Sequence, residues 1–308
     1  MESLSICDYN DCTHKVDFGM KIKFMFCFLI LIQLVACSEK KDGIDSDLLL
    51  SVVALQPKPD RAENYDRDVQ IITHTPNVPT KLNATVGCNV NYYSDEDVDY
   101  FVRRLKLEIA RYPRGYWIKA NAERVVLCRS ITLDGRLVSP FSTADAIFLI
   151  VEERMASRGE EMTTFDNVTY KYFDGNTGIN HELTHSVDRN IPPAYYVYSD
   201  WLNLNYSGFE YGKERDNYPF TTNFWNPLPG FVAEYGTINF QEDRGTIGAL
   251  IMGSQPLYNK LVQACQTDPI VAAKVRKIVA GWNAFWPFPG AENTEWKIRM
   301  AQVEKDCK

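Results

Sequence analysis

Residues 181–185 read His-Glu-Leu-Thr-His, and this segment restricts the fold more than any other feature of the sequence. The two histidines are four residues apart, so a helix would place them on one face, one turn apart. Ile179, Leu183 and Val187 are also four apart and lie on the opposite side, where they can pack on a core. The segment therefore predicts a helix that is buried on one face and presents both histidines to a cleft.

The same segment fits the H-E-x-x-H pattern of zinc hydrolases. Neutral imidazoles at this spacing can share a metal ion, and they suit zinc. Glu182, directly after the first histidine, would be the general base that takes a proton from a zinc-activated water and passes it to the leaving group. The alternative is a pair of surface histidines without a metal. We expect His181 and His185 to bind one Zn²⁺ per chain in a hydrolytic enzyme.

Two histidines do not complete such a site, because a catalytic zinc takes three protein ligands and a water. His14 lies in a part of the chain that we expect to be removed, and His74 lies near the expected tether. No further histidine follows the motif at the metzincin spacing. The third ligand is therefore expected to be a carboxylate, and the candidates are Glu210, Glu214, Glu234, Glu242 and Asp243.

Two features near the motif each allow two interpretations. Asp188, seven residues after His181, is either a group that orients a ligand or substrate, or a solvated acid at the end of the helix. The aromatic stretch 194–225 is either a loop that lines a substrate site or a long connection whose rings pack on the core.

The N-terminal region has the pattern of a secretory leader. Residues 20–36 combine Lys21 and Lys23 with an apolar run that is too short to cross a bilayer comfortably. The run ends in Leu-Val-Ala-Cys at residues 34–37, which resembles the lipobox of bacterial lipoproteins, whose cysteine carries the lipid. A short membrane anchor or a buried helix is the alternative. We expect Cys37 to be lipidated.

This leader predicts a protein anchored by lipid in the bacterial outer membrane, on its surface or its periplasmic face. The net charge is −7 and no block of Lys or Arg is present, so we expect no nucleic-acid partner. The expected organisation is a misassigned start (1–19), a signal peptide (20–36), the lipidated cysteine with a tether and linker (37–80) and one folded domain (81–308).

Four cysteines remain after Cys37, and none of them forms a C-x-x-C pair. A zinc-thiolate site is therefore not expected. The four residues can form one or two disulfides, with three possible full pairings, or they can be small buried thiols. They are Cys88, Cys128, Cys265 and Cys307.

The pattern of apolar residues predicts an α+β fold. An apolar stripe predicts a helix from Ser94 to the proline and glycine at 113–115, and two apolar runs predict strands within 124–133 and 146–153. A second stripe predicts a helix over 268–286. We expect a small mixed sheet, the motif helix and a C-terminal helical subdomain.

Residues 230–245, "GFVAEYGTINFQEDRG", resemble the second motif of a Bacteroidetes family of lipoprotein metallopeptidases, the substrate-import-associated zinc metallohydrolases. The layout is also similar to gluzincins of the anthrax lethal-factor type. The resemblance implies a zincin-like domain in which Glu242 is the third zinc ligand and Tyr235, seven residues earlier, stabilises the oxyanion. It further implies hydrolysis of a peptide or glycoconjugate substrate near an outer-membrane nutrient importer.

The sequence departs from this family at one place. Where the family pattern continues with Ala-Glu, this chain has Gly245 and Thr246. The missing glutamate would normally steady a ligand, and Asp188 or Asp243 could substitute for it. The departure keeps a second function open, that of an accessory or binding lipoprotein of an importer complex with little or no catalysis.

Overall fold

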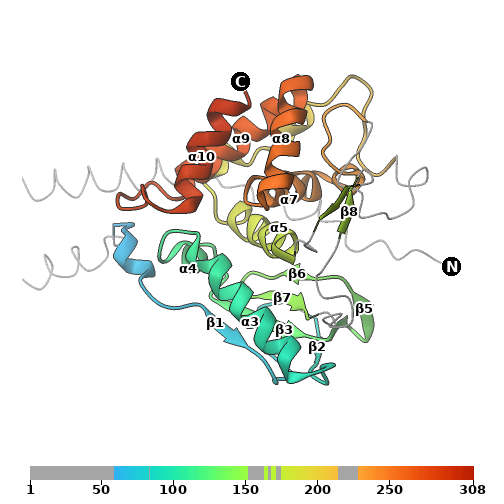
Figure 1. Cartoon of the computed structure of the whole chain (residues 1–308), viewed down its shortest axis with the longest axis vertical. Helices are drawn as coiled ribbons and strands as arrows, with labels where there is room; N and C mark the ends of the chain where they lie inside the picture. Colours follow the sequence, from blue (N-terminus) through green and yellow to red (C-terminus); the bar gives the residue numbers. More distant parts are fainter. Residues whose placement is uncertain (1–58, 83, 152–162, 166–167, 171–174, 214–227) are drawn as a thin grey trace, which may run out of the picture. The chain divides into compact units, whose positions relative to one another are not determined.

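The structure is a computed structural model in which most of the chain after residue 58 is described (Figure 1). The described residues are 59–82, 84–151, 163–165, 168–170, 175–213 and 228–308. All of them except Pro59 belong to one compact unit, Asp60–Lys308. The predicted leader, Cys37 and the carboxylate candidate Glu214 lie outside these residues. Within the described part of the chain, no helix combines the length and the apolar character that a membrane span requires.

Helices make up most of the second half of the unit. The helices of the described residues are η2 (Ala62–Tyr65), α3 (Asp95–Ala110), α4 (Tyr116–Lys119), α5 (Gly175–Asp188), η4 (Pro193–Tyr195), α6 (Tyr198–Leu202), η6 (Glu234–Thr237), α7 (Phe240–Ile251), α8 (Gln255–Thr267), α9 (Pro269–Phe285) and α10 (Glu295–Asp306). The predicted helices α3, α5 and α9 are thereby confirmed. Ser94 caps α3, because its side chain accepts a hydrogen bond from the backbone N–H of Asp97.

A four-stranded mixed sheet lies on one side of α5. Its order is β1 (Gln70–Ile72), β3 (Arg124–Cys128), β7 (Ile147–Ile150) and β6 (Phe141–Ser142). The first three strands are parallel, and β6 runs antiparallel at the edge. The two inner strands are almost entirely apolar and buried, as a parallel strand covered on both faces requires.

Three further strands form a separate antiparallel sheet in the order β2 (Val86–Asn89), β4 (Ser130–Leu133) and β5 (Arg136–Val138). Asp134 and Gly135 both have positive φ and make the two-residue turn between β4 and β5. The predicted strand 124–133 is therefore two strands in two sheets, because the chain changes sheet at Arg129. A two-stranded hairpin, β8 (Thr163–Phe165) with β9 (Val168–Tyr170), stands apart from both sheets.

The folded unit starts earlier than the sequence predicts. We expected a linker up to residue 80, but Gln70–Ile72 pairs in parallel with β3 as strand β1. The ring of Tyr65 also packs beside Trp286 after α9, with 6.2 Å between ring centroids. A three-residue strand is too short to show a periodic pattern, so the sequence concealed this contribution to the sheet.

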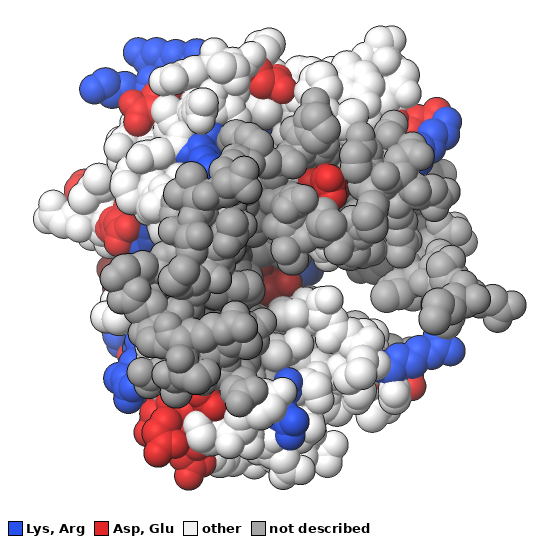
Figure 2. Space-filling model, turned by 45° about the vertical axis from the view of Figure 1, so that its right-hand side comes forward, with Lys and Arg blue, Asp and Glu red and all other residues white. Residues whose placement is uncertain are grey.

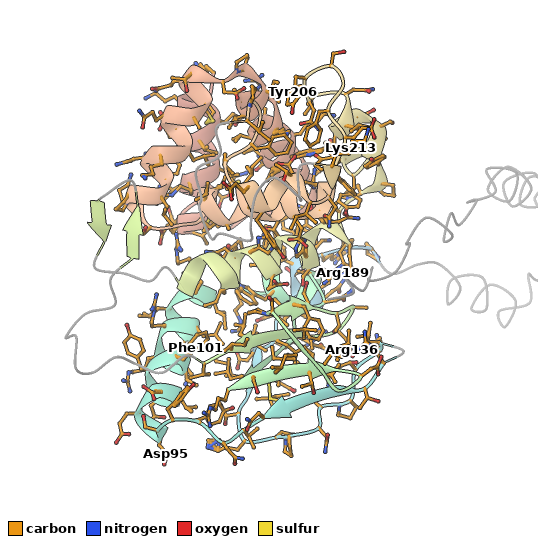
Figure 3. The ribbon with its side chains drawn as sticks, turned by 90° about the vertical axis from the view of Figure 1, so that its right-hand side faces the viewer. Asp95, Phe101, Arg136, Arg189, Tyr206 and Lys213 are labelled. Carbon is orange, nitrogen blue, oxygen red and sulfur yellow. A yellow bond between two sulfur atoms is a disulfide. The ribbon has the colours of Figure 1, made fainter. Side chains whose placement is uncertain are left out.

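The main hydrophobic core includes residues from the mixed sheet, from α5 and from the C-terminal helices. Ile179, Leu183 and Val187 of α5 are at most 2% exposed, so the predicted buried face of this helix is confirmed. Figures 1 and 3 show α5 between the sheet and the helices α7 to α10, with Arg189 just past the end of α5. The C-terminal helices therefore share their core with the sheet and do not form an independent subdomain.

All four predicted mature cysteines are paired. Cys88 on β2 is bonded to Cys128 at the end of β3, and Cys265 on α8 is bonded to Cys307 after α10. The first bond joins the two sheets, and the second joins the end of α10 to α8.

The two disulfides are expected to contribute similar stability, because they close loops of similar length, 40 and 42 residues. Replacing either pair by alanines should lower the free energy of unfolding by about 2–4 kcal/mol, measured by urea denaturation without reductant. A reductant should destabilise the wild type but not a variant that lacks both pairs. No loss of stability in either double variant would contradict the pairing.

Candidate metal centre

The two histidines of α5 meet at their outer ring nitrogens. His181 and His185 are 12% and 14% exposed in their side chains, and their Nε2 atoms are 3.0 Å apart. The rings stand edge to face with 4.6 Å between their centroids. Both rings therefore present their Nε2 atom to the same small space.

A carboxylate from α7 completes this cluster. Asn239 caps α7 by accepting a hydrogen bond from the backbone N–H of Glu242, 2.8 Å away, which places Glu242 in the first turn of the helix. Glu242 Oε2 lies 2.8 Å from His181 Nε2 and 3.4 Å from His185 Nε2. Burial opposes the charge of Glu242, but hydrogen bonds from both histidines hold the pKa of this carboxyl well below its ordinary value.

This arrangement fits a zinc ion. Tetrahedral ligands at about 2.0 Å from zinc are roughly 3.3 Å from one another. The three atoms of His181, His185 and Glu242 are separated by 2.8, 3.0 and 3.4 Å, so they need to move apart by at most about half an ångström. Two imidazoles and one carboxylate also match the ligand set of catalytic zinc sites.

Glu182 lies beside the cluster, on the side of β6. One carboxylate oxygen of Glu182 and one ring nitrogen of each histidine, His181 and His185, all lie within 4.8 Å of one another. The side chain is 6% exposed, and no described residue hydrogen-bonds its Oε2 atom. Burial raises the pKa of Glu182, and the neighbouring His185 and His181 oppose that shift. A buried carboxylate with an unpartnered oxygen is suited to accept a proton from a group bound at the cluster.

Tyr235 contributes a phenol to the same place. It lies on η6, and its ring centroid is 5.7 Å from that of His181. Burial and the carboxylates of Glu242 and Glu182 raise the pKa of Tyr235 well above its ordinary value. The hydroxyl therefore keeps its proton and can donate a hydrogen bond.

The other carboxylate candidates have different environments. Glu210 is exposed and pairs with Lys213 at 2.7 Å. Asp243 is fully buried, and its Oδ2 lies 2.7–2.8 Å from donors of three side chains, Trp201, Tyr211 and Lys274. Among the described carboxylates, Glu242 is the one that contacts both histidines.

Asp188 is not a solvated acid at the end of the helix, so that interpretation is wrong. Asp188 is buried and accepts two hydrogen bonds, at 2.7 and 2.6 Å, from the guanidinium of Arg244 on α7. That guanidinium lies over the rings of Tyr196 and Trp201. Asp188 therefore fixes the end of α5 to α7, and its charge also acts on His185.

Two glycines of α7 let this helix approach α5 closely. A β-carbon at Gly245 would lie 2.7–3.0 Å from three ring atoms of His181, and one at Gly248 would lie 2.2 Å from Thr184 Oγ1. Real β-carbons do not approach other atoms so closely, so the imidazole of His181 requires a glycine at this position. The sequence held a signal for this contact, because an interior helix glycine stands three residues after Glu242.

Thr246, at the place of the missing glutamate, does not reach the cluster through its hydroxyl. Its Oγ1 donates to the backbone carbonyl of Asp243 at 2.9 Å. The suggested substitutes, Asp188 and Asp243, each hold their own buried cation. Neither one has a described hydrogen bond to a histidine of the cluster.

The aromatic stretch partly supports both of its interpretations, as far as residue 213. Trp201 and Phe209 are buried in the core, which agrees with the packing interpretation. Tyr195 and Tyr198 are 43% and 51% exposed, and the ring of Tyr198 meets Phe240 at the start of α7 edge on. The exposed ring of Tyr198 therefore lies next to the helix that carries Glu242.

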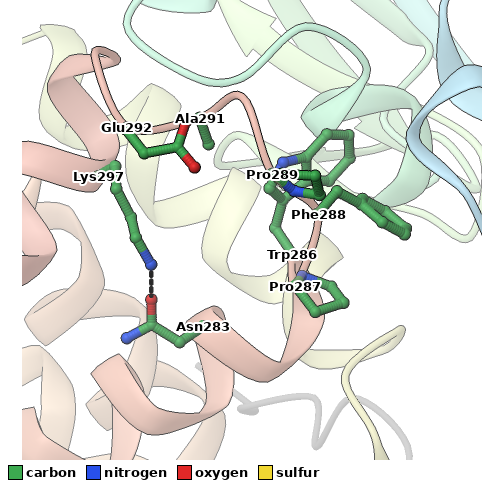
Figure 4. A pocket seen from close by; sticks show the side chains of 8 residues that line it. All are labelled: Asn283, Trp286, Pro287, Phe288, Pro289, Ala291, Glu292 and Lys297. Carbon is green, nitrogen blue, oxygen red and sulfur yellow. Dashed lines mark hydrogen bonds between the residues drawn. The ribbon is translucent and has the colours of Figure 1, made fainter.

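Figure 2 shows acidic and basic side chains of the described residues interspersed on one face of the protein. A pocket of about 480 Å³ lies after α9, where Lys297 donates to Asn283 at 2.7 Å beside Trp286 and Phe288 (Figure 4). Its lining contains none of the candidate site residues.

Comparison of the chain with protein-family models, with curated proteins and with solved structures found no match.

Replacing Gly245 by alanine is expected to weaken zinc binding by at least tenfold, because the added methyl must displace the ring of His181. The affinity can be measured by competition with a chromogenic chelator. Gly178→Ala is the matched control, since Gly178 also lies in a helix but an added β-carbon there meets no atom within 4 Å. Equal zinc affinity in the two variants would show that the contact with His181 does not matter.

Proposed function

We propose that this protein is a zinc-dependent hydrolase that cleaves a peptide bond or a related amide. The observation that carries the proposal is the convergence of His181 and His185 from α5 with Glu242 from α7 within 3.4 Å. Glu182 and Tyr235 beside this cluster add a proton acceptor and a proton donor. Three ligands, a base and a hydroxyl in one place are more than a structural metal site needs.

When bound, a zinc ion supplies Lewis acidity, which polarises a carbonyl and lowers the pKa of water toward ~7. Glu182 would accept a proton from the attacking water and return it to the leaving nitrogen. Tyr235 would donate a hydrogen bond to the negative charge that develops on the carbonyl oxygen. Because Glu182 is buried, bulk water screens its electrostatic interactions less than it would at the surface.

The zincin-like fold, the outer-membrane anchor at Cys37 and the link to nutrient import belong to the same proposal. They are supported by the lipobox at residues 34–37 and by the family resemblance of residues 230–245. In this setting the substrate is a peptide or glycoconjugate that is trimmed at the cell envelope before uptake.

A second candidate function is that of an accessory importer lipoprotein that binds metal without efficient catalysis. It is favoured by Thr246, whose hydroxyl is turned to the backbone of its own helix where the family has a glutamate. The two functions differ in their dependence on Glu182, which only the enzyme requires.

We expect the purified wild type to contain close to one zinc per chain and Glu242→Ala to contain almost none, measured by elemental analysis after dialysis. Glu210→Ala removes an exposed carboxylate and should retain the zinc. Asp243→Ala should also retain zinc affinity but lose stability, because it leaves the charge of Lys274 buried and unpaired. A zinc-free wild type, even after zinc is added back, would contradict the metal centre.

Glu182→Gln is expected to keep the zinc and to lower hydrolysis by a factor of about 10²–10⁴, because the amide cannot accept the proton. Casein and a mixture of internally quenched peptides are suitable substrates for a first assay. If the wild type and Glu182→Gln hold zinc equally and neither hydrolyses any of them, the accessory function is favoured.

A further inference from the structure

Ser142 lies on the edge strand β6, and the pairing of that strand fixes the direction of its side chain. Phe141 pairs with Phe148, and the two rings stack with 5.1 Å between their centroids. Phe148 belongs to the smaller core cluster under the second sheet. Ser142 pairs with Ile147, which belongs to the main core together with α5. Since side chains alternate along a strand, Ser142 points to the face of the sheet that α5 covers.

Strand β6 is also fixed against the side of α5 that carries Glu182. Glu182, Ser186 and Arg189 follow one another at i, i+4 and i+7, so they share one side of the helix axis. Arg189 donates to the carbonyl of Thr143, the residue after Ser142, at 2.8 Å, and to Ser186 Oγ at 3.1 Å. This anchor holds the end of β6 along the side of α5 that carries Glu182.

The hydroxyl of Ser142 and one carboxylate oxygen of Glu182 both lack a hydrogen-bond partner among the described residues. No described residue hydrogen-bonds Ser142 Oγ or Glu182 Oε2, and both atoms are buried. Leaving such groups unpaired is costly, whereas a serine hydroxyl can rotate to donate to a charged carboxylate. The side chain of Ser142 lies within interaction range of the carboxylate of Glu182.

The remaining groups that act on Glu182 lie on the metal side. They are His181, His185 and Glu242, and the outer ring nitrogens of the two histidines face Glu242. Ser142 is therefore the neutral donor that reaches Glu182 from the sheet.

We infer that Ser142 is a positioning residue, whose hydroxyl donates a hydrogen bond to the carboxylate of Glu182 and so directs that carboxylate toward the metal ligands. The inference rests on the proposed hydrolase function, which gives Glu182 its role as base. It assigns a catalytic task to the edge strand, because β6 then holds the base from the side opposite to the metal.

The competing explanation is that the hydroxyl only fills space. An unpartnered buried hydroxyl destabilises a fold, so Ser142→Ala would then leave function unchanged and would leave stability equal or higher. The two explanations therefore predict different results for one substitution.

The experiment uses the purified protein loaded with Co²⁺, which makes the metal site visible by its absorption. The probe is acetohydroxamate, which binds a divalent metal through two oxygens and offers protons to a neighbouring carboxylate. Its Kd is measured by absorption titration for the wild type and for Ser142→Ala, Ser142→Thr and Glu182→Gln. Ser130→Ala on β4 is the matched control, since it removes another half-buried strand hydroxyl.

We expect Ser142→Ala to bind acetohydroxamate roughly fivefold to tenfold more weakly, with unchanged Co²⁺ content, which is the effect of one lost charge-assisted hydrogen bond. Ser142→Thr keeps the hydroxyl and should stay within about twofold of the wild type by the same reasoning. Ser130→Ala should match the wild type.

If Ser142→Ala binds like the wild type while Glu182→Gln binds more weakly, the inference is overturned and the metal centre stands. If Ser142→Ala loses Co²⁺ or melts at a much lower temperature, its role is structural and the inference is also overturned. A wild type that takes up no Co²⁺ would instead overturn the proposed function itself.

Discussion

The close packing of α7 on α5 is the constraint on which the rest of the site depends. Gly245 and Gly248 remove the side chains that would separate the two helices, so the imidazole of His181 lies against the backbone of α7. Glu242, one turn before Gly245, then reaches both histidines with its carboxylate. The cost of glycine in a helix, about 1 kcal/mol each relative to alanine, is offset by this contact.

Two buried ion pairs fix the same helix pair in register. Asp188 and Arg244 join the end of α5 to α7, while Asp243 joins α7 to Lys274 on α9. Such pairs add little net stability, because both charges leave water, but a mismatched arrangement would leave a buried charge alone. Lys274 also donates to the carbonyl of Gly230, and the N–H of Gly230 donates to the carboxylate of Asp268. The segment that carries Tyr235 therefore starts from a fixed point.

The sequence predicts well those features that repeat along one element. The apolar stripe of Ile179, Leu183 and Val187 and the face of the two histidines follow from helical spacing alone. Contacts between distant segments are a different matter, because no local pattern encodes them. The partner of Cys88, the three donors around Asp243 and the split of residues 124–133 into two sheets are of this kind. Ser142 belongs with them, since a two-residue strand carries no periodic signal.

The anchors around α7 fix its start from several directions. Tyr211 is held by Asp243 and the N–H of Gly212 by the carbonyl of Thr237, whereas Gly230 is held from α9. The position of Glu242 therefore depends on residues that lie outside the metal centre. The exposed side chains of Tyr195 and Tyr198 carry none of these anchors, so descendants of one ancestral chain could vary them and diverge in what they recognise while inheriting the same ligands unchanged.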